Sequence, residues 1–322
     1  HITEMKVTCV AAAMLAAPMC VAFAPTHPSG LQPAARLNRA ALCSAPSLRH
    51  TSTRLSVGTS MMAAKPSGPR WTVEDASAKK EAGGKGDDEA VKGKMPSLAK
   101  ALKKPKGTIC IVSAVKRKDP VEGKLCQMTD DGFILSEVGR GFHDAKVAGI
   151  AVWTDEDKYG TSMEDLQTIA ESQKSFKGNF PGPCPILALD LFMTKAAVGD
   201  AARSGASAVL LSVEMLGDDL AGMMEHAAAC AMDPVLLCND EDDVKAAVAA
   251  GGGLIAIDSK AIGMDEAIEL RKGIDAKTIS IAFGGLNELL DAWKLRDAGF
   301  QCVVVGAELM SCAFGKAGEV RQ

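Results

Sequence analysis

Beyond Lys94 the sequence alternates between short apolar runs and longer amphipathic segments, and this alternation limits the fold more than any other feature. The apolar runs are three to seven residues long and nearly continuous, which is typical of strands buried on both faces of a parallel sheet. The eight expected strands are Thr108–Ala114, Ile150–Trp153, Ile186–Leu189, Ala208–Leu211, Val235–Leu237, Leu254–Ile257, Thr278–Ala282 and Cys302–Val305.

Six helices are expected between these strands, at Glu164–Gln173, Lys195–Ser204, Asp218–Ala231, Glu241–Ala250, Met264–Lys272 and Leu286–Ala298. Gly205, Gly251 and Gly299 follow three of them, where a left-handed residue ends a helix. This order predicts an α/β fold, a closed (β/α)8 or TIM barrel within residues 95–322. An open doubly wound sheet is the alternative. It usually needs fewer strands, and no Gly-x-Gly-x-x-Gly follows the first strand, which disfavours a dinucleotide site.

Charge and cysteine spacing disfavour several classes of function. A formal net charge of −4 argues against a nucleic-acid-binding protein, which normally carries a basic face. The ten cysteines are irregularly spaced, without a Cys-x-x-Cys pair or a Cys/His cluster spaced for zinc. We therefore expect reduced, mostly buried thiols, and neither a metal nor a cofactor.

Residues 5–70 have the composition of a targeting leader. An apolar stretch, Val7–Phe23, follows Lys6 and is broken by Pro18, as in the short core of a signal peptide. No Asp or Glu occurs from Met5 to Val73, and the stretch after Phe23 is rich in Ser, Ala and Arg, as in a transit peptide. Such a bipartite leader resembles those of algae with secondary plastids, which predicts the plastid stroma or a stroma-facing assembly. Ordinary secretion is the alternative, but it does not explain the acid-free tract. After removal of the leader we expect no stable membrane span.

Residues 71–94 consist mainly of Lys, Glu, Asp, Gly and Ala, with few large apolar side chains. Such a composition buries too little apolar surface to offset the entropy of ordering the chain. We therefore expect a charged, disordered linker between the leader and the barrel.

The segments around the predicted strand ends form an ordered set of motifs: Ala114-Val-Lys-Arg-Lys-Asp-Pro120, Thr154–Ser162, Pro185-Ile-Leu-Ala-Leu-Asp190, Gly205–Leu211 and Val303–Met310. In order and spacing, over about residues 95–315, this set resembles the indole-3-glycerol-phosphate synthase family. The segment Pro96–Lys104 is similar to the family's N-terminal helix that covers the barrel.

The resemblance implies a reaction that closes an indole ring from a carboxyphenylamino-deoxyribulose phosphate, with loss of carbon dioxide and water. Such a reaction needs a general acid, a carboxylate base, cationic groups for the substrate carboxylate and donors for its phosphate. In a barrel these groups lie at the carboxyl ends of the strands and in the loops after them.

Most side chains that the resemblance assigns to this chemistry are replaced. The general acid, a lysine of the third strand, is Leu189 here, and the general base, a glutamate of the fifth strand, is Leu237. The first-strand glutamate is Ala114, while the lysine near it is retained as Lys116. Leucine cannot transfer a proton, and an acid or a base typically contributes about 10²–10⁴-fold. We therefore expect the family's reaction to be lost.

The segments that would hold the substrate also differ from the family's pattern. Asp258–Lys260 stands where the family has Asn-x-Arg, and Phe283–Gly285 stands where it has Glu-Ser-Gly. The serine of the first loop is Asp119, which would repel a phosphate at close range, and the Gly-Ser of the last strand is Gly306–Ala307.

The remaining polar residues at strand ends are the candidate site residues. Lys116, Asp190 and Asp258 could form a new acid–base set, and structural ion pairs are the alternative explanation for them. The candidates for binding substrate or phosphate are Tyr159, where the family places an aromatic ring against the substrate, and Lys260, Gly284, Gly285 and Gly306, near the usual phosphate site of a barrel. Packing of Tyr159 and tight turns at the glycines are the corresponding alternatives.

Three functions fit this pattern. The first is a catalytically degenerate barrel, or pseudoenzyme, that acts as a binding or scaffold subunit with a protein partner in the plastid. The second is an active indole-3-glycerol-phosphate synthase, a lyase of tryptophan biosynthesis, with its chemistry carried by other residues. The third is a barrel enzyme with a new small phosphorylated ligand, using Lys116, Asp190 and Asp258. Because leucines stand at the acid and base positions, the first is our prediction.

Overall fold

The computed structural model describes residues 70–84, 86, 90, 95–105, 107–120, 123–125, 135–286 and 289–306. All but the last residue of the predicted leader, residues 5–70, lie outside this part of the chain. Within it, no helix is both long enough and apolar enough to cross a lipid bilayer.

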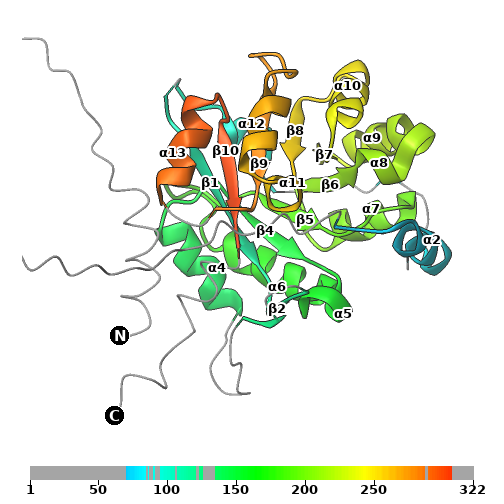
Figure 1. Cartoon of the computed structure of the whole chain (residues 1–322). Helices are drawn as coiled ribbons and strands as arrows, with labels where there is room; N and C mark the ends of the chain where they lie inside the picture. Colours follow the sequence, from blue (N-terminus) through cyan, green and yellow to red (C-terminus); the bar gives the residue numbers. More distant parts are fainter. Residues whose placement is uncertain are drawn as a thin grey trace, which may run out of the picture. The chain divides into compact units, whose positions relative to one another are not determined.

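Eight parallel strands close into a barrel in the order β1-β10-β9-β8-β7-β6-β5-β4, with β4 pairing back onto β1 (Figure 1). The strands are β1 (Cys110–Val115), β4 (Gly149–Trp153), β5 (Ile186–Leu189), β6 (Ala208–Ser212), β7 (Asp233–Cys238), β8 (Leu254–Ile257), β9 (Ile279–Phe283) and β10 (Cys302–Val305). Each predicted apolar run overlaps one of them, because strands covered on both faces need apolar side chains at almost every position. The predicted (β/α)8 barrel is confirmed.

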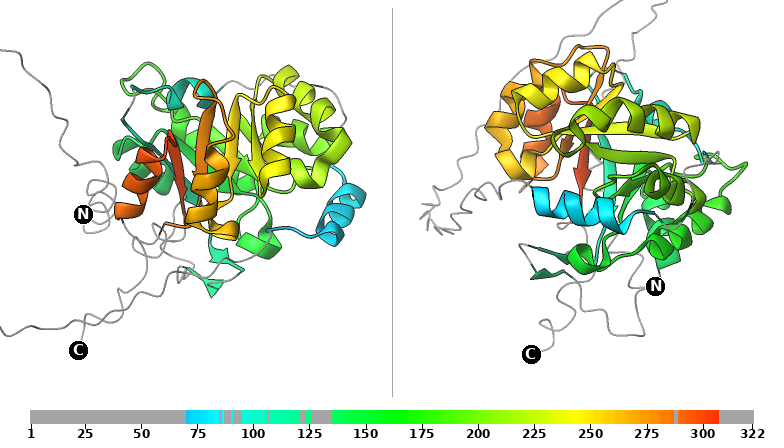
Figure 2. Two further views of the ribbon diagram at one scale, coloured as in Figure 1. Left: turned by 45° about the horizontal axis from the view of Figure 1, so that its top comes forward. Right: turned by 90° about the vertical axis from the view of Figure 1, so that its right-hand side faces the viewer.

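Helices connect successive strands and lie outside the ring that the strands form (Figures 1 and 2). They are α4 (Leu135–Asp144), α6 (Met163–Lys174), α7 (Lys195–Arg203), α9 (Leu220–Ala229), α10 (Glu241–Ala249), α12 (Met264–Arg271) and α13 (Leu289–Asp297). Side chains cap several of them; Ser162 and Thr194, for example, accept hydrogen bonds from the first turns of α6 and α7. The six predicted helices are present, whereas α4 was not expected.

Short elements follow several strands and build the mouth of the barrel at the carboxyl ends. They are the hairpin of β2 (Lys118–Asp119) and β3 (Gly123–Lys124), the one-turn helices α5 (Glu156–Tyr159), α8 (Val213–Leu216) and α11 (Ser259–Ile262), and the 3-10 turn η1 (Gly217–Asp219). Polar side chains at the strand ends begin these turns. Asp155 and Asp258, for example, accept hydrogen bonds from backbone N–H groups of α5 and α11.

The expected covering helix is present as α3 (Leu98–Leu102), and it lies at the opposite, amino-terminal end of the strands. Leu98 and Leu102 are buried, and Leu98 packs beside Gly149 at the start of β4. The carboxylate of Asp233, at the start of β7, accepts hydrogen bonds of 2.8 Å from Ser97 Oγ and 2.9 Å from the Ala99 backbone N–H. Helix α3 therefore covers the amino end of the barrel and leaves the mouth to other elements.

The prediction of a disordered linker is wrong for the residues just after Arg70, because helix α2 (Val73–Ala82) begins there. Its amino terminus carries a capping box, in which Thr72 and Asp75 exchange hydrogen bonds between side chain and backbone. One large side chain, Trp71, is 4% exposed and anchors the segment to the barrel. Composition alone hides such an anchor, since one buried tryptophan and a few ion pairs suffice to order a short helix. Residues 85, 87–89 and 91–94 of the predicted linker lie outside the described part.

Candidate ligand site at the barrel mouth

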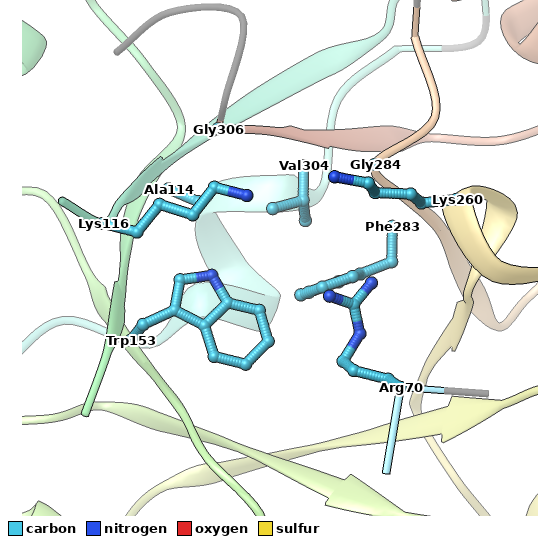
Figure 3. A pocket seen from close by; sticks show the side chains of 9 residues that line it. All are labelled: Arg70, Ala114, Lys116, Trp153, Lys260, Phe283, Gly284, Val304 and Gly306. Carbon is cyan, nitrogen blue, oxygen red and sulfur yellow. The ribbon is translucent and has the colours of Figure 1, made fainter. Parts of the chain in front are cut away.

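Residues from six parts of the chain line one pocket at the carboxyl ends of the strands (Figure 3). They include four of the predicted site residues, namely Lys116, Lys260, Gly284 and Gly306, together with Arg70, Ala114, Trp153, Phe283 and Val304. The space between them, about 330 Å³ including the part open to solvent, lies at the end of the barrel where ligands of this fold bind. The mouth is thus where a ligand of this barrel would bind.

The register of the strands shows which way Leu189 and Leu237 face, the two residues at the positions that the resemblance assigns to the acid and the base. Residues paired across neighbouring strands share a face of the sheet, and side chains alternate between the two faces along each strand. Ala114 lines the pocket and pairs with Ala151, two residues before Trp153, which pairs with Leu189. On the other side of the barrel, Ile281 lies two residues before Phe283, which lines the pocket. Ile281 pairs with Ala256, and Ala256 pairs with Leu237 of β7. Leu189 and Leu237 therefore face the barrel interior, and both are fully buried.

Asp119 lies between the two lysines of the pocket. Its Oδ2 accepts a hydrogen bond of 2.5 Å from Lys116 Nζ and one of 3.1 Å from Lys260 Nζ. Figure 3 shows the two lysine side chains pointing toward one another from opposite sides of the pocket. Burial lowers the pKa of Lys116 below its ordinary value. The hydrogen bond between Lys116 and Asp119 and the negative charge of Asp119 oppose this shift only in part. The carboxylate expected to repel a phosphate is here the counter-ion of both ammonium groups.

A second ion pair, between Arg70 and Asp258, lies in the same mouth. Arg70 Nε donates a 2.8 Å hydrogen bond to Asp258 Oδ2, and Arg70 Nη2 donates a second of 2.8 Å to Oδ1. Burial by itself lowers the pKa of Arg70, but the charge of Asp258, the nearby Tyr159 and their hydrogen bonds raise it above its ordinary value. The guanidinium is therefore charged at neutral pH.

Aromatic rings form one wall of the mouth. The rings of Trp153 and Tyr159 stack with centroids 3.7 Å apart, and Phe283 meets Trp153 edge-on at 6.1 Å. Tyr159 is 2% exposed, and burial raises its pKa. It lies behind Trp153, outside the set of pocket-lining residues, so Trp153 presents its ring to a ligand where the resemblance suggested Tyr159.

Asp190 is held in ion pairs away from the pocket. Its Oδ1 lies 2.8 Å from Lys79 Nζ of helix α2, and its Oδ2 accepts a 3.2 Å hydrogen bond from Thr154 Oγ1. The structure therefore does not bring Lys116, Asp190 and Asp258 together as one acid–base set. Each of the three has its own counter-ion: Asp119, Lys79 and Arg70 respectively.

The glycines after β9 are required by backbone geometry. Gly284 and Gly285 have φ values of 76° and 75°, in the left-handed region that glycine favours. A Cβ on Gly285 would lie 2.7 Å from the carbonyl oxygen of Ser259, so the turn packs directly against α11. Gly306 approaches Ala114 and Lys116 across the pocket. The tight-turn explanation accounts for Gly284 and Gly285, and Gly284 and Gly306 also line the void.

Residues 69–317 match the family model described as indole-3-glycerol phosphate synthase. The chain belongs to this family. The indole-3-glycerol phosphate synthase of Opitutus terrae is 26% identical over 228 residues, which cover 69% of this chain and 83% of that protein. The enzyme of that name from Sulfurisphaera tokodaii is 26% identical over 219 residues, covering 66% and 83%. Among solved structures, the N-acetylmannosamine-6-phosphate 2-epimerase of Clostridium perfringens aligns with a TM-score of 0.49 and 14% identity, over 69% of this chain and 94% of that one.

The indole-3-glycerol phosphate synthase family match begins at residue 69, just before Arg70, whereas the motifs in the sequence placed the start of the domain at residue 95. Sequence reasoning missed Arg70 because it assigned this residue to the leader. The local signals were present: a tryptophan follows directly, and Thr72 and Asp75 have the spacing of a capping box. Among the described residues, no three His, Cys, Asp or Glu side chains are grouped as metal ligands would be.

Proposed function

We propose that this member of the indole-3-glycerol phosphate synthase family has lost the ring-closing reaction and acts as a non-catalytic binding or scaffold subunit in the plastid. The observation that carries the proposal is the pair of fully buried leucines, Leu189 and Leu237, facing the barrel interior. The family resemblance places the general acid and the general base at these two positions. A hydrocarbon side chain neither donates nor accepts a proton, so two contributions of about 10²–10⁴-fold each are missing.

The other titratable groups of the mouth support the same proposal. Lys116 hydrogen bonds to Asp119 at 2.5 Å, and Asp258 is held in a bidentate pair by Arg70. Loss of a proton from Lys116, or gain of one by Asp258, would leave its partner as an uncompensated buried charge, which is unfavourable. These two ion pairs are therefore not poised to act as a substitute acid and base.

An assay of indole-3-glycerol phosphate formation with the purified full chain tests this proposal. The synthase of Opitutus terrae serves as the positive control, and complementation of a tryptophan auxotroph provides a second readout. We expect no turnover above background from a sample that unfolds cooperatively on heating. Turnover within about tenfold of the control would overturn the proposal and would mean that other side chains carry the chemistry.

A second candidate function, binding of a small phosphorylated ligand, is favoured by the two lysines that face one another across the pocket. Lys116 and Lys260 are contributed by different loops, and Gly284 and Gly306 line the space between them. Titration with inorganic phosphate, followed by thermal unfolding, tests this function. We expect a saturable rise in melting temperature that Lys116→Ala abolishes. The absence of that rise would leave the scaffold role alone.

The plastid location rests on the composition of residues 5–70, which lack acidic side chains and are rich in Arg and Ser. Expression of these residues ahead of a fluorescent protein, in an alga with a secondary plastid, tests it. Fluorescence confined to the plastid stroma is the expected result, and fluorescence in the medium would indicate secretion instead.

A further inference from the structure

The Asp258 carboxylate is completely buried at the end of β8, and its counter-ion comes from a residue 188 positions earlier in the chain. Arg70 approaches it with two parallel hydrogen bonds of 2.8 Å, the fork geometry that a guanidinium forms with a carboxylate. The Arg70 side chain is 11% exposed, so both charges have left water. A lysine ammonium, with a single nitrogen, cannot make the same two parallel bonds.

Two aromatic rings complete the surroundings of this guanidinium. The Arg70 Cζ lies 5.2 Å from the centroid of the Trp153 ring and 4.9 Å from that of Phe283. Both distances fall within the range in which a planar cation is attracted to an aromatic face. Figure 3 shows the Arg70 side chain entering the mouth beside both rings. The carboxylate of Asp258 and the rings of Trp153 and Phe283, which we call the box, therefore surround Arg70 with groups that bind a guanidinium.

The segment that carries Arg70 is attached to the rim of the barrel by further ion pairs. Lys79 of α2 lies 3.1 Å from Asp155 and 2.8 Å from Asp190, and Asp75 lies 2.8 Å from Lys158. These pairs are partly exposed, so each contributes little by itself. The buried contacts of Arg70 and Trp71 therefore define where the segment ends in the mouth. We call residues 70–82 the strap.

If Arg70 is withdrawn, the box keeps a strong requirement for a cation. Asp258 would retain a 3.2 Å hydrogen bond from the Ala261 backbone N–H but would lose its bidentate partner. A buried carboxylate without a counter-ion is unfavourable, and the space that the guanidinium leaves is bounded by Trp153 and Phe283. The shape and charge of this space fit a guanidinium better than an ammonium, which is more strongly hydrated.

We propose that Asp258, Trp153 and Phe283 form a guanidinium-binding site at the barrel mouth, and that Arg70 fills this site as an intramolecular ligand. A guanidino compound or an arginine side chain from outside binds there only when the strap withdraws Arg70. The proposal is independent of whether the barrel retains any turnover, because it concerns occupancy of the box and not the chemistry of the pocket.

Chemical rescue of Arg70→Ala in the full chain tests this proposal. The alanine keeps Cβ, so ethylguanidinium supplies the atoms that the substitution removes. We expect the variant to melt about 5–10 °C below the wild type, since breaking a buried pair in a domain of this size shifts the melting temperature by this order. Ethylguanidinium chloride at millimolar concentrations, far below denaturing levels, is expected to restore at least half of this loss with a saturable dependence.

Three controls define the result. Ethylammonium chloride at the same concentrations is expected to restore little, because it lacks the fork. The wild type is expected to show no saturable response, because Arg70 already occupies the box. The double variant Arg70→Ala, Asp258→Asn is expected to lose the response to ethylguanidinium. Equal rescue by both cations, or no saturable rescue of a folded Arg70→Ala, would overturn the proposal.

A second measurement covers the case in which Arg70→Ala does not fold by itself. Denatured Arg70→Ala is refolded in buffer without additive, with ethylguanidinium, or with ethylammonium at the same concentration. A folded yield that rises several-fold with ethylguanidinium, and not with ethylammonium, supports the site. An unchanged yield overturns it.

Discussion

Lys116 donates a 2.5 Å hydrogen bond to the carboxylate of Asp119, three residues further along the chain, and both side chains are almost fully buried. The family resemblance places Lys116 at a retained cationic position and Asp119 at a position where the family has a serine. The retained charge is therefore neutralised by a residue that replaced a neutral one, and an anionic ligand must compete with Asp119 for the Lys116 ammonium.

This competition predicts that Asp119→Asn strengthens phosphate binding. Removal of the carboxylate leaves both Lys116 and Lys260 without their shared counter-ion, so the potential in the pocket becomes more positive. We expect the affinity for inorganic phosphate to rise about tenfold, which corresponds to about 1.4 kcal/mol. Isothermal titration at low ionic strength measures it. Asp219→Asn, which removes an exposed pair with Lys80, is the matched control and should leave the affinity unchanged.

Leu189 and Leu237 are predicted to contribute to the stability of the barrel core. Leu189→Ala and Leu237→Ala each remove a fully buried side chain, so each should lower the free energy of unfolding by about 2–5 kcal/mol. Unfolding in urea measures the change. Leu290→Ala, at a position 52% exposed, is the control and should change it by less than about 0.5 kcal/mol. A loss below about 1 kcal/mol at Leu189 or Leu237 would mean that the side chain is not packed as described.

The strands could be predicted from the sequence because a barrel strand is apolar at almost every position, as in Ile186–Leu189 and Cys302–Val305. Helix α4 could not, since Gly139 lowers its helix propensity. The structure explains that glycine: a Cβ there would lie 2.6 Å from Ser172 Oγ of α6. The close contact between the two helices is a tertiary constraint, and no local pattern reveals it.

Only the part of the candidate site that lies directly after strands could be predicted from the sequence. Lys116, Lys260, Gly284 and Gly306 were expected at the mouth because each follows a strand, and they do line one pocket. Arg70 could not be found in this way, since its partner is 188 positions away and its neighbours resemble a leader. Contacts between distant segments depend on packing of the whole chain, whereas strand ends are set by the local pattern.

Asp243 gives the stability of the protein a predictable dependence on pH. Burial raises the pKa of this carboxyl from 3.8 to about 6, while a hydrogen bond from the Asn239 backbone N–H opposes the shift. Between these two pH values the folded protein binds more protons at this site than the unfolded chain does, so this residue makes stability fall as pH rises. Asp243→Asn should therefore stabilise the protein by about 1 kcal/mol at pH 7 and by less at pH 4.5. Urea unfolding at both values measures the difference, and an equal effect at both would contradict the shifted pKa.

The strap is predicted to belong to the folded domain, which a pair of shortened chains can test. A chain that begins at residue 65 keeps Arg70, Trp71 and α2, whereas one that begins at residue 95 lacks all three. The shorter chain would leave Asp258 buried without Arg70 and would expose the face of Trp153 that Trp71 and Arg70 cover. We expect it to melt at least about 5 °C lower, or to be insoluble, because an uncompensated buried charge and an exposed aromatic surface both disfavour the folded state. Differential scanning calorimetry of the two chains measures this shift. Equal melting temperatures would show that the barrel closes its mouth without residues 65–94, and that the boundary at residue 95 drawn from the motifs is the correct one.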